Sequence, residues 1–344
     1  MVEQRWEEVA GLSAMEGWRL PVLLYRGSSN RPGAYLQAAL HADEPPGVAV
    51  IHELARLLER AEAEGRLQEN VTLVPYANPI GLTQVIDGRH LGRFHLASGT
   101  NFNRAFPLPN AGRDQPAPVR ADNALKKALL KLAEGASVIL DLHCDKEAAL
   151  YMYTHAELWP GAIDLAARLE VAAVLLWAGT EEGGAAFEEA VTVDRLPSTP
   201  AKRFLSATVE LRGRTDVDAA LARRDARALY ELLADRAILS DPAIGPRPAW
   251  EGPAVRHDQV INVTAPALGA MFLEVPLGMR VSQGQCLARI LAEPGAGEVS
   301  VPAPADGLLI IRAADRMARP GDTIATILTD RPAPGSAAGR TLSN

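Results

Sequence analysis

Short apolar runs alternate with longer segments of helical periodicity between residue 34 and about residue 233. Six runs are short, rich in β-branched or aromatic residues and bounded by turn or polar residues, which is typical of strands. They are 34–40, 71–76, 137–142, 149–154, 172–177 and 207–211. Segments 46–65 and 123–135 repeat apolar residues with the period of an amphipathic helix. This alternation predicts an α/β domain with a mainly parallel or mixed sheet flanked by helices.

The helical periodicity ends at a stretch rich in proline and glycine, which we interpret as a linker. Beyond it, two similar halves follow each other, 263–290 and 301–328. Such a duplication predicts a small all-β barrel-sandwich domain. We therefore divide the chain into an α/β domain, a linker, a duplicated β domain and a small polar tail that we expect to be disordered: 1–240, 241–254, 255–330 and 331–344.

The duplicated β segment resembles biotinyl/lipoyl-type domains, whose function depends on one modified lysine at a hairpin tip. No lysine follows Lys202 in the sequence. The resemblance thus implies the fold and excludes a carrier of a covalent cofactor. We expect a structural or lid role for this segment.

Composition restricts the partners. The 344 residues are 48% hydrophobic and 22% charged, with 35 basic against 42 acidic residues and no basic block, so we expect no nucleic acid partner. The two cysteines, Cys144 and Cys286, fall in separate predicted domains, so we expect no disulfide and a reducing compartment. The acidic start of the chain does not resemble a signal peptide, and no apolar run is long enough for a membrane span. These features predict a cytoplasmic protein.

Two histidines directly follow predicted strands: His41 after 34–40 and His143 after 137–142. Groups at the carboxyl ends of parallel strands project into the crevice where ligands bind. Glu44 lies three residues after His41, so the three side chains can converge on one ion. Two imidazoles and one carboxylate, with a position left for water, are typical of a catalytic zinc site. In the alternative, His41 hydrogen-bonds a loop and Glu44 stabilises the N-terminus of the following helix.

Three more residues are candidates for binding or catalysis. Asn103 and Arg104 are adjacent in a predicted loop, and such a pair can hold a carboxylate with charge-assisted hydrogen bonds. Glu210 falls within the predicted strand 207–211, where a buried carboxylate is costly unless it has a partner or a task. The alternative for Glu210 is a salt bridge to Arg212 or Arg214.

Two features neighbour these candidates. Asp141 precedes His143 by two residues, so on a strand it shares a face with His143 and can orient an imidazole. A backbone or arginine partner is the alternative for Asp141. The acidic segment 180–190 is interpreted as a solvated loop that leads into a helix, with a border of the substrate pocket as the alternative.

Five motifs occur in one characteristic order: HADEPPG (41–47), NPIGL (78–82), NFNRAFP (101–107), DLHC (141–144) and VELRG (209–213). Through them the chain resembles the succinylglutamate desuccinylase/aspartoacylase family, a branch of the zinc carboxypeptidase clan. The resemblance extends into the C-terminal β segment and thus covers most of the chain. It implies a zinc-carboxypeptidase-like fold for residues 1–240 and hydrolysis of the amide bond of an N-acyl amino acid or a similar small amide that bears a carboxylate.

The resemblance also implies roles for individual residues. One Zn²⁺ ion per chain would be bound by His41, Glu44 and His143, and Glu210 would be the general base. The pair that matches the family's binding site for the substrate carboxylate is Asn103 and Arg104. A further arginine usually polarises the scissile carbonyl in this family, and the candidates are Arg89 and Arg93.

Two other functions remain open. One is a metallocarboxypeptidase that acts on short peptides, which the added β domain disfavours because in this family it narrows access to the site. The other is a non-catalytic zinc-dependent binding module, which Glu210 disfavours because a pure ligand site needs no general base. The sequence leaves open the acyl group and the amino acid, and it is compatible with a homo-oligomer.

Overall fold

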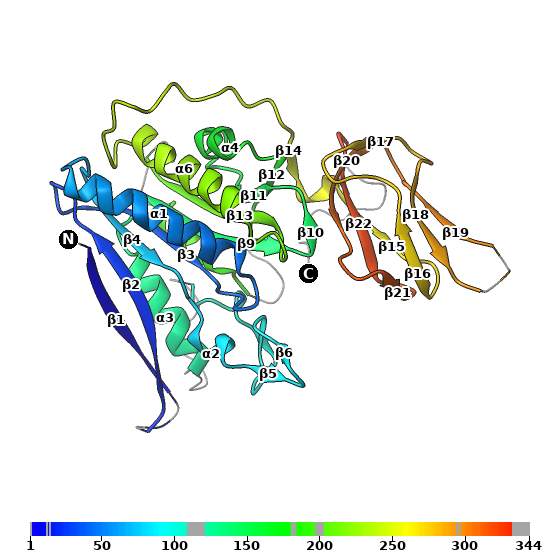
Figure 1. Ribbon diagram of the computed structural model, residues 1–344, viewed down its shortest axis with the longest axis horizontal. Coiled ribbons are helices and arrows are strands. Elements are labelled where there is room, and N and C mark those ends of the chain that lie inside the picture. Colours follow the sequence, from blue (N-terminus) through cyan, green and yellow to red (C-terminus); the bar gives the residue numbers. More distant parts are fainter. Residues whose placement is uncertain are drawn as a thin grey trace.

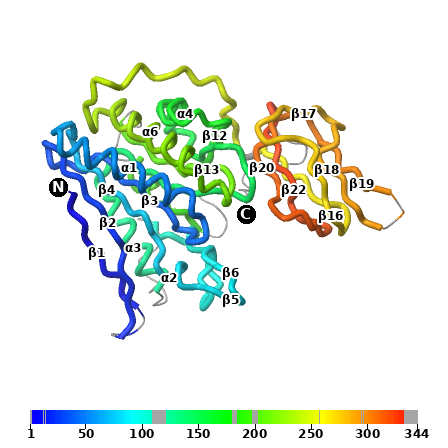
Figure 2. The backbone as a smooth tube through the Cα atoms, in the orientation of Figure 1, coloured from blue at the N-terminus to red at the C-terminus, as the bar shows by residue number. Residues whose placement is uncertain are grey.

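The computed structural model describes residues 2–11, 13, 15–108, 121–179, 184–196, 203–293, 295 and 297–331. Within these ranges, one large sheet with helices on both faces is followed by two smaller sheets near the C-terminus (Figure 1). The tube in Figure 2 shows that the two smaller sheets lie beside one end of the large sheet. No helix of the described residues is long and apolar enough to cross a membrane.

The large sheet has nine strands in the order β1-β2-β4-β3-β9-β13-β11-β12-β14. In chain order they are β1 Glu3–Ala10, β2 Gly17–Tyr25, β3 Pro32–Ala38, β4 Asn70–Val74, β9 Val138–Asp145, β11 Tyr151–His155, β12 Ala173–Trp177, β13 Leu205–Gly213 and β14 Ala254–Arg256. Strands β4, β3, β9 and β13 are parallel, β11 is antiparallel to β13, and β1 and β2 add antiparallel edge pairs. The predicted α/β class is confirmed, with a mixed sheet.

Six α-helices lie in the described residues: α1 Pro46–Ala63, α2 Pro79–Leu82, α3 Ala121–Ala133, α4 Ile163–Leu169, α5 Phe187–Arg195 and α6 Ala219–Asp235. The apolar residues of α1, α4 and α6 pack in one core cluster on one face of the sheet, and those of α3 and α5 pack in a second cluster. Every residue of β9 is buried, as expected for a central strand covered on both faces.

Four short strands between α2 and α3 form two hairpins. The strands are β5 Val85–Ile86, β6 Arg89–His90, β7 Phe94–His95 and β8 Thr100–Asn101. β5 pairs with β6, and β7 pairs with β8. Arg89 lies in β6, Arg93 lies between the two hairpins, and Asn103 and Arg104 follow β8.

The C-terminal segment and β10 of the preceding part form the two smaller sheets, with orders β10-β20-β22-β15 and β19-β18-β16-β21, and β17 pairs with β20. Their elements are β10 Glu147–Ala148, the 3₁₀ helix η1 His257–Gln259, β15 Val260–Thr264, β16 Gly269–Leu273, β17 Arg280–Val281, β18 Cys286–Leu291, β19 Val299–Pro302, β20 Gly307–Arg312, β21 Met317–Ala318 and β22 Thr323–Leu328. Buried residues of both sheets share one core cluster.

The two predicted halves of this segment repeat one packing detail. A Cβ atom at Gly269 would lie 2.3 Å from the carbonyl oxygen of Leu291, and a Cβ atom at Gly307 would lie 2.3 Å from that of Leu328. Only glycine fits at either place, because the neighbouring strand is too close for any side chain. The two glycines hold the same position in the duplicated motif.

Two strands join the α/β part to the C-terminal part. β14 lies across the predicted boundary at residue 254 and pairs with β12 of the large sheet. β10, which follows β9, pairs with β20 of the C-terminal part. Val255 is buried together with Leu175 and Ile310, so the two parts share an apolar cluster.

Both cysteines are free, as predicted. The predicted tail lies outside the described residues after Arg331.

Candidate metal centre and active site

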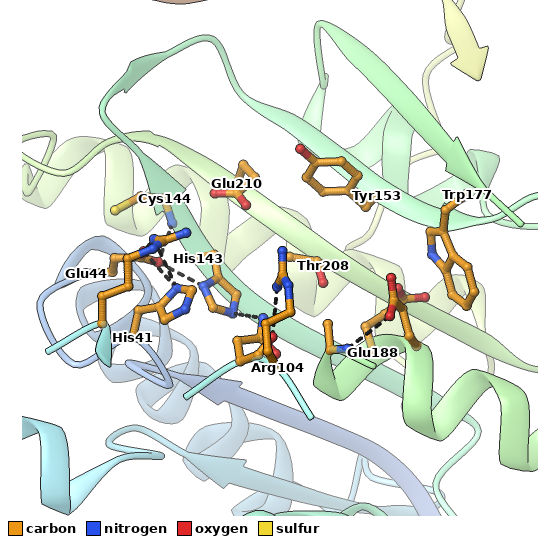
Figure 3. Close-up of a pocket in the computed structure, with 14 residues that line it drawn as sticks. His41, Glu44, Arg104, His143, Cys144, Tyr153, Trp177, Glu188, Thr208 and Glu210 are labelled. Atoms are coloured by element: carbon orange, nitrogen blue, oxygen red, sulfur yellow. Dashed lines mark hydrogen bonds and ion pairs between the residues drawn. The ribbon is translucent and has the colours of Figure 1, made fainter. Parts of the chain in front are cut away.

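The fold brings His41, Glu44 and His143 together. His41 and Glu44 lie between β3 and α1, while His143 lies in β9, the parallel neighbour of β3. One ligand-type atom from each side chain lies within 4.8 Å of the other two, and all three residues are buried. Figure 3 shows the three side chains at one end of a cavity of about 90 Å³.

The NPIGL motif fixes the chain just before His41. Asn78 Nδ2 donates to the carbonyl oxygen of Leu40 at 2.8 Å, and Asn78 Oδ1 accepts from the backbone N–H of Gly81 at 2.8 Å. Asn78 therefore caps α2 and holds the end of the strand that presents His41.

Both imidazoles direct the same ring atom at the carboxylate. His41 Nδ1 lies 3.0 Å from Glu44 Oε1, and His143 Nδ1 lies 2.9 Å from Glu44 Oε2. The backbone N–H of Cys144 donates to Glu44 Oε2 at 3.1 Å. The three potential ligands thus face one point.

The other ring nitrogens contact acceptors. His41 Nε2 lies 2.8 Å from Asn101 Oδ1, and His143 Nε2 lies 2.9 Å from Asp141 Oδ2. A proton on Nε2 of His41 leaves its Nδ1 lone pair available to a cation, while His143 Nε2 lies beside Asp141 and also 3.3 Å from Asn103 Nδ2. The predicted contact of Asp141 with an imidazole is confirmed, whereas the role of Asn101 was missed although it lies in the NFNRAFP motif. The donor set of two imidazoles and one carboxylate could hold a metal ion.

Opposite charges set the pKa values of this group. Burial lowers the pKa of His143, but Asp141 and Glu44 outweigh burial and hold this pKa well above its usual value. Burial raises the pKa of Glu44, but His41 and His143 outweigh it and hold this pKa well below its usual value. Burial lowers the pKa of His41 in spite of the neighbouring Glu44.

Of the two candidate arginines, only Arg93 is among the described residues that line the cavity. Arg93 Nη1 donates to Glu44 Oε1 at 3.0 Å, whereas Arg89 lies exposed in β6. Gly92 makes this placement possible, because a Cβ atom there would lie 2.3 Å from the backbone nitrogen of Asp43. The loop before Arg93 therefore packs directly on the backbone next to Glu44.

Asn103 and Arg104 also line the cavity. Asn103 is buried, and its Oδ1 accepts from the backbone N–H of Phe187 at 2.8 Å, which ties this loop to the start of α5. Arg104 Nη1 donates to the carbonyl oxygen of Asn103 at 2.8 Å. The predicted pair therefore reaches the cavity from one loop.

Glu210 lies in β13, directly opposite His143 of β9. Its Oε2 atom is buried without a hydrogen-bond partner, and burial raises the pKa of Glu210 to about 8. Arg212 pairs with Asp225 and Arg214 pairs with Asp43, so the alternative of a salt bridge from Glu210 to either arginine is wrong. The Glu210 carboxyl group thus lines the cavity with one oxygen, Oε2, that forms no hydrogen bond within the described residues.

The end of the cavity away from His41 was predicted only in part, through the alternative that segment 180–190 borders the substrate pocket. Trp177, Tyr153, Glu188 and Glu189 line it, and Trp177 and Glu188 lie side by side in Figure 3. Within 180–190, a helix begins at Phe187 as predicted, and residues 180–183 lie outside the described ranges. The preferred interpretation of this segment as solvated is wrong for Glu188 and Glu189, because the first turn of α5 packs against β9 and β13 and both residues are buried.

In this α/β fold, a buried His-Glu-His group lies at the carboxyl ends of the central strands. The Oε2 atom of Glu210, which has no hydrogen-bond partner, lines the same cavity. These features define a class of proteins with a candidate metal site at this edge of the sheet. Residues 30–236 match the model of the succinylglutamate desuccinylase/aspartoacylase catalytic domain. This match spans more than half of the chain, which therefore belongs to this family. The sequence matches none of the curated proteins.

Solved structures share this fold over nearly the whole chain. A succinylglutamate desuccinylase/aspartoacylase family protein from Shewanella amazonensis SB2B is 23% identical, with a TM-score of 0.81 over 96% of this chain and 99% of that one. The product-bound ectoine utilization protein EutE (DoeB) from Ruegeria pomeroyi is 20% identical, with a TM-score of 0.71 over 95% of each chain. A succinylglutamate desuccinylase/aspartoacylase from Rhodobacter sphaeroides is 18% identical, with a TM-score of 0.72 over 96% of each chain.

Proposed function

We propose that this protein is a zinc-dependent hydrolase that cleaves the amide bond of an N-acyl amino acid or a similar small amide that bears a carboxylate. One observation carries the proposal: the buried group of His41, Glu44 and His143 shares a cavity with Glu210, whose Oε2 atom has no partner. Membership in the desuccinylase/aspartoacylase family supports the reaction class.

His41, Glu44 and His143 would hold one Zn²⁺ ion, which when bound lowers the pKa of a water molecule and polarises a carbonyl group. Glu210 takes a proton from the attacking water, whose oxygen forms a bond to the amide carbon. Glu210 then gives this proton to the amide nitrogen as the C–N bond breaks. The products are a carboxylic acid and an amine. A pKa raised towards neutrality suits a group that must both accept and donate a proton.

Asn103 and Arg104 bind the carboxylate of the substrate, because an amide and a guanidinium offer several hydrogen-bond donors in a fixed arrangement. Arg93 stabilises the negative charge that develops on the carbonyl oxygen. We assign this role to Arg93 rather than Arg89 because Arg93 lines the cavity and contacts Glu44.

The C-terminal part is proposed to be a barrel-sandwich domain that restricts access to the site. Its strand β20 pairs with β10, which lies four residues beyond His143. Glu147 in β10 forms ion pairs with Arg312 and Arg316 of the C-terminal part at 2.7 Å each.

We also propose a cytoplasmic location, which the two free thiols support.

Two alternatives are weaker. A carboxypeptidase for short peptides needs open access to the site, which the proposed role of the C-terminal part disfavours. A non-catalytic zinc-dependent module needs no base, which leaves the buried carboxyl oxygen of Glu210 without a purpose.

Amine release tests the proposal. The full chain, loaded with zinc or stripped with a chelator, is incubated with N-acetyl, N-succinyl and N-formyl amino acids and with dipeptides. We expect zinc-dependent amine release from at least one acyl amino acid and slower release from dipeptides. Absence of amine release from every acyl amino acid by the zinc-loaded protein would contradict the proposal.

A further inference from the structure

The large sheet ends in a long strand, β1, with one edge that no described strand covers. β1 pairs only with β2, and it runs along the outside of the molecule (Figures 1 and 2). All eight of its residues pair with β2 one to one, without a bulge, and none is proline. The strand at the other end of the sheet, β14, has three residues. A long, regular edge is a template for a further strand, because its outward N–H and C=O groups are unpaired.

The hydrogen bonds to β2 determine which residues of β1 present backbone groups at this edge. Directly beyond the last pair of the two strands, the backbone N–H of Gly11 donates to the carbonyl oxygen of Glu16 at 3.0 Å. The bonding direction alternates along an antiparallel strand, so the odd-numbered residues of β1 bond to β2 and the even-numbered residues point their N–H and C=O groups outward. A further strand would therefore bond to Gln4, Trp6 and Glu8.

The side chains of β1 carry charges of both signs. Arg5 lies between Glu3 and Glu7 on one face of the strand, and all of its residues except Glu7 and Val9 are exposed. Charged side chains usually keep edge strands apart. A strand with both signs of charge can instead attract a second copy of itself, provided that the register places opposite charges across from each other.

Symmetry and charge select one register for two copies of β1. Outward-pointing residues must oppose each other in an antiparallel pair, so even-numbered residues lie opposite even-numbered ones. More than half of the strand is then paired when the two-fold axis passes at Arg5, Trp6, Glu7 or Glu8. An axis at any of the three charged residues places that residue opposite its own copy, which is repulsive. An axis at Trp6 places Arg5 of each copy opposite Glu7 of the other.

We propose that two copies of this chain associate through β1, antiparallel about a two-fold axis at Trp6, so that their large sheets join into one continuous sheet. Arg5 and Glu7 then form two symmetric ion pairs at positions without backbone hydrogen bonds between them, where side chains of paired strands are closest. The two indole rings of Trp6 form an aromatic pair at the axis. In the single chain Trp6 is 52% exposed, and the guanidinium carbon of Arg19 lies 5.2 Å from the centroid of its ring.

This inference is independent of the proposed function. β1 and β2 precede residues 30–236, the part of the chain that matches the catalytic domain of the family. The experiments below need neither zinc nor a substrate, so their outcome leaves the proposed hydrolysis untouched.

Sedimentation equilibrium of the full chain over a range of protein concentrations measures the association. Arg5→Glu and Glu7→Arg each place like charges opposite each other at two symmetric positions, so each should raise the Kd of the dimer at least about tenfold. The double variant restores opposite charges, and its Kd should return to within about threefold of the original value. Glu8→Gln is the matched control: it removes a charge from the same strand opposite the uncharged Gln4 and should change the Kd by less than about twofold.

Hydrogen exchange tests the backbone pairing without any substitution. The amides of Gln4, Trp6 and Glu8 should exchange slowly at concentrations at which the chain is a dimer and rapidly after dilution to the monomer. The amides of Arg5 and Glu7 bond to β2 and are the internal control, because they should be protected in both states.

A chain that remains a monomer at every concentration would overturn the inference and leave a different protein as the partner of this edge. A dimer whose Kd neither Arg5→Glu nor Glu7→Arg changes would place the interface elsewhere and overturn it as well. Rapid exchange of the Trp6 amide in the dimer would show that the strands do not pair and would equally reject the proposed contact.

Discussion

Asp141 Oδ2 lies 2.9 Å from Nε2 of His143, on the side of the imidazole away from the Nδ1 atom that faces Glu44. The other carboxylate oxygen of Asp141 accepts from Gln37 Nε2 at 3.0 Å, and Gln37 in turn accepts from the hydroxyl of Tyr35 at 2.7 Å. All of these residues are buried. Gln37 thus holds the carboxylate of Asp141 beside the imidazole of His143 from within the sheet.

We predict that Asp141→Asn weakens zinc binding by about 10- to 100-fold. An amide side chain of the same shape has no charge, so the ion pair that places a carboxylate beside His143 Nε2 is lost. Competition with a chromophoric chelator measures the affinity. Unchanged affinity in a variant with an unchanged circular dichroism spectrum would show that Asp141 does not position His143.

Zinc binding at pH 7 is predicted to release protons. In the metal-free site, the pKa of His143 is held well above its usual value and that of Glu210 is raised to about 8, so both groups carry a proton at neutral pH. A metal ion binds only the neutral imidazole, so the apparent zinc affinity should rise as the pH rises through neutrality.

Titration calorimetry in two buffers of different ionisation enthalpy counts these protons. We expect at least one proton released per zinc ion at pH 7. Equal heats in the two buffers, together with a zinc affinity that does not change with pH, would contradict this electrostatic description of the site.

Glu210→Gln should leave zinc bound but lower kcat by about 10²- to 10⁴-fold, because the amide cannot accept the proton of the attacking water. Zinc content by atomic absorption and the initial rate of amine release are measured on the same sample. Full activity in this variant would exclude Glu210 as the general base.

Stability depends on an ion pair just after Glu210. Arg212 donates to both carboxylate oxygens of Asp225 in α6 at 2.8 Å, and Asp225 is 2% exposed. Arg212→Met should lower the free energy of unfolding by about 3 kcal/mol, because it breaks a largely buried pair. Arg227→Met, which breaks the more exposed pair with Glu231, is the control and should cost below about 1 kcal/mol. Equal effects of the two changes on urea unfolding would contradict this difference.

Much of the α/β part was predictable because its strands are short apolar runs and its helices have a clear period. All six predicted strands and both predicted helices are present, with ends that differ by a few residues. The N-terminal pair of β1 and β2 was missed, since most residues of β1 are exposed and show no apolar alternation. β14 was missed because three residues in a proline-rich stretch carry no pattern, and its pairing with β12 is a tertiary contact.

The site was predictable where spacing and strand ends determine it. His41, Glu44 and His143 meet because parallel strands end at one edge of the sheet. The choice between Arg89 and Arg93 depends on how the β5–β6 and β7–β8 hairpins fold over this edge, which no local pattern reveals. Glu188 was read as solvated because acidic residues at a helix start are usually exposed, and only the packing of α5 against β13 turns it inward.

The most direct test of the central claim is turnover as a function of zinc added to metal-stripped protein, with the acyl amino acid that gives the fastest amine release. We predict a rate that rises linearly and reaches a plateau at one zinc ion per chain, and no such rise in His143→Ala, which should lose most of its zinc. A rate that is independent of added zinc, or a plateau at the same stoichiometry in His143→Ala, would contradict the assignment of His41, Glu44 and His143 as the metal site of a zinc-dependent hydrolase.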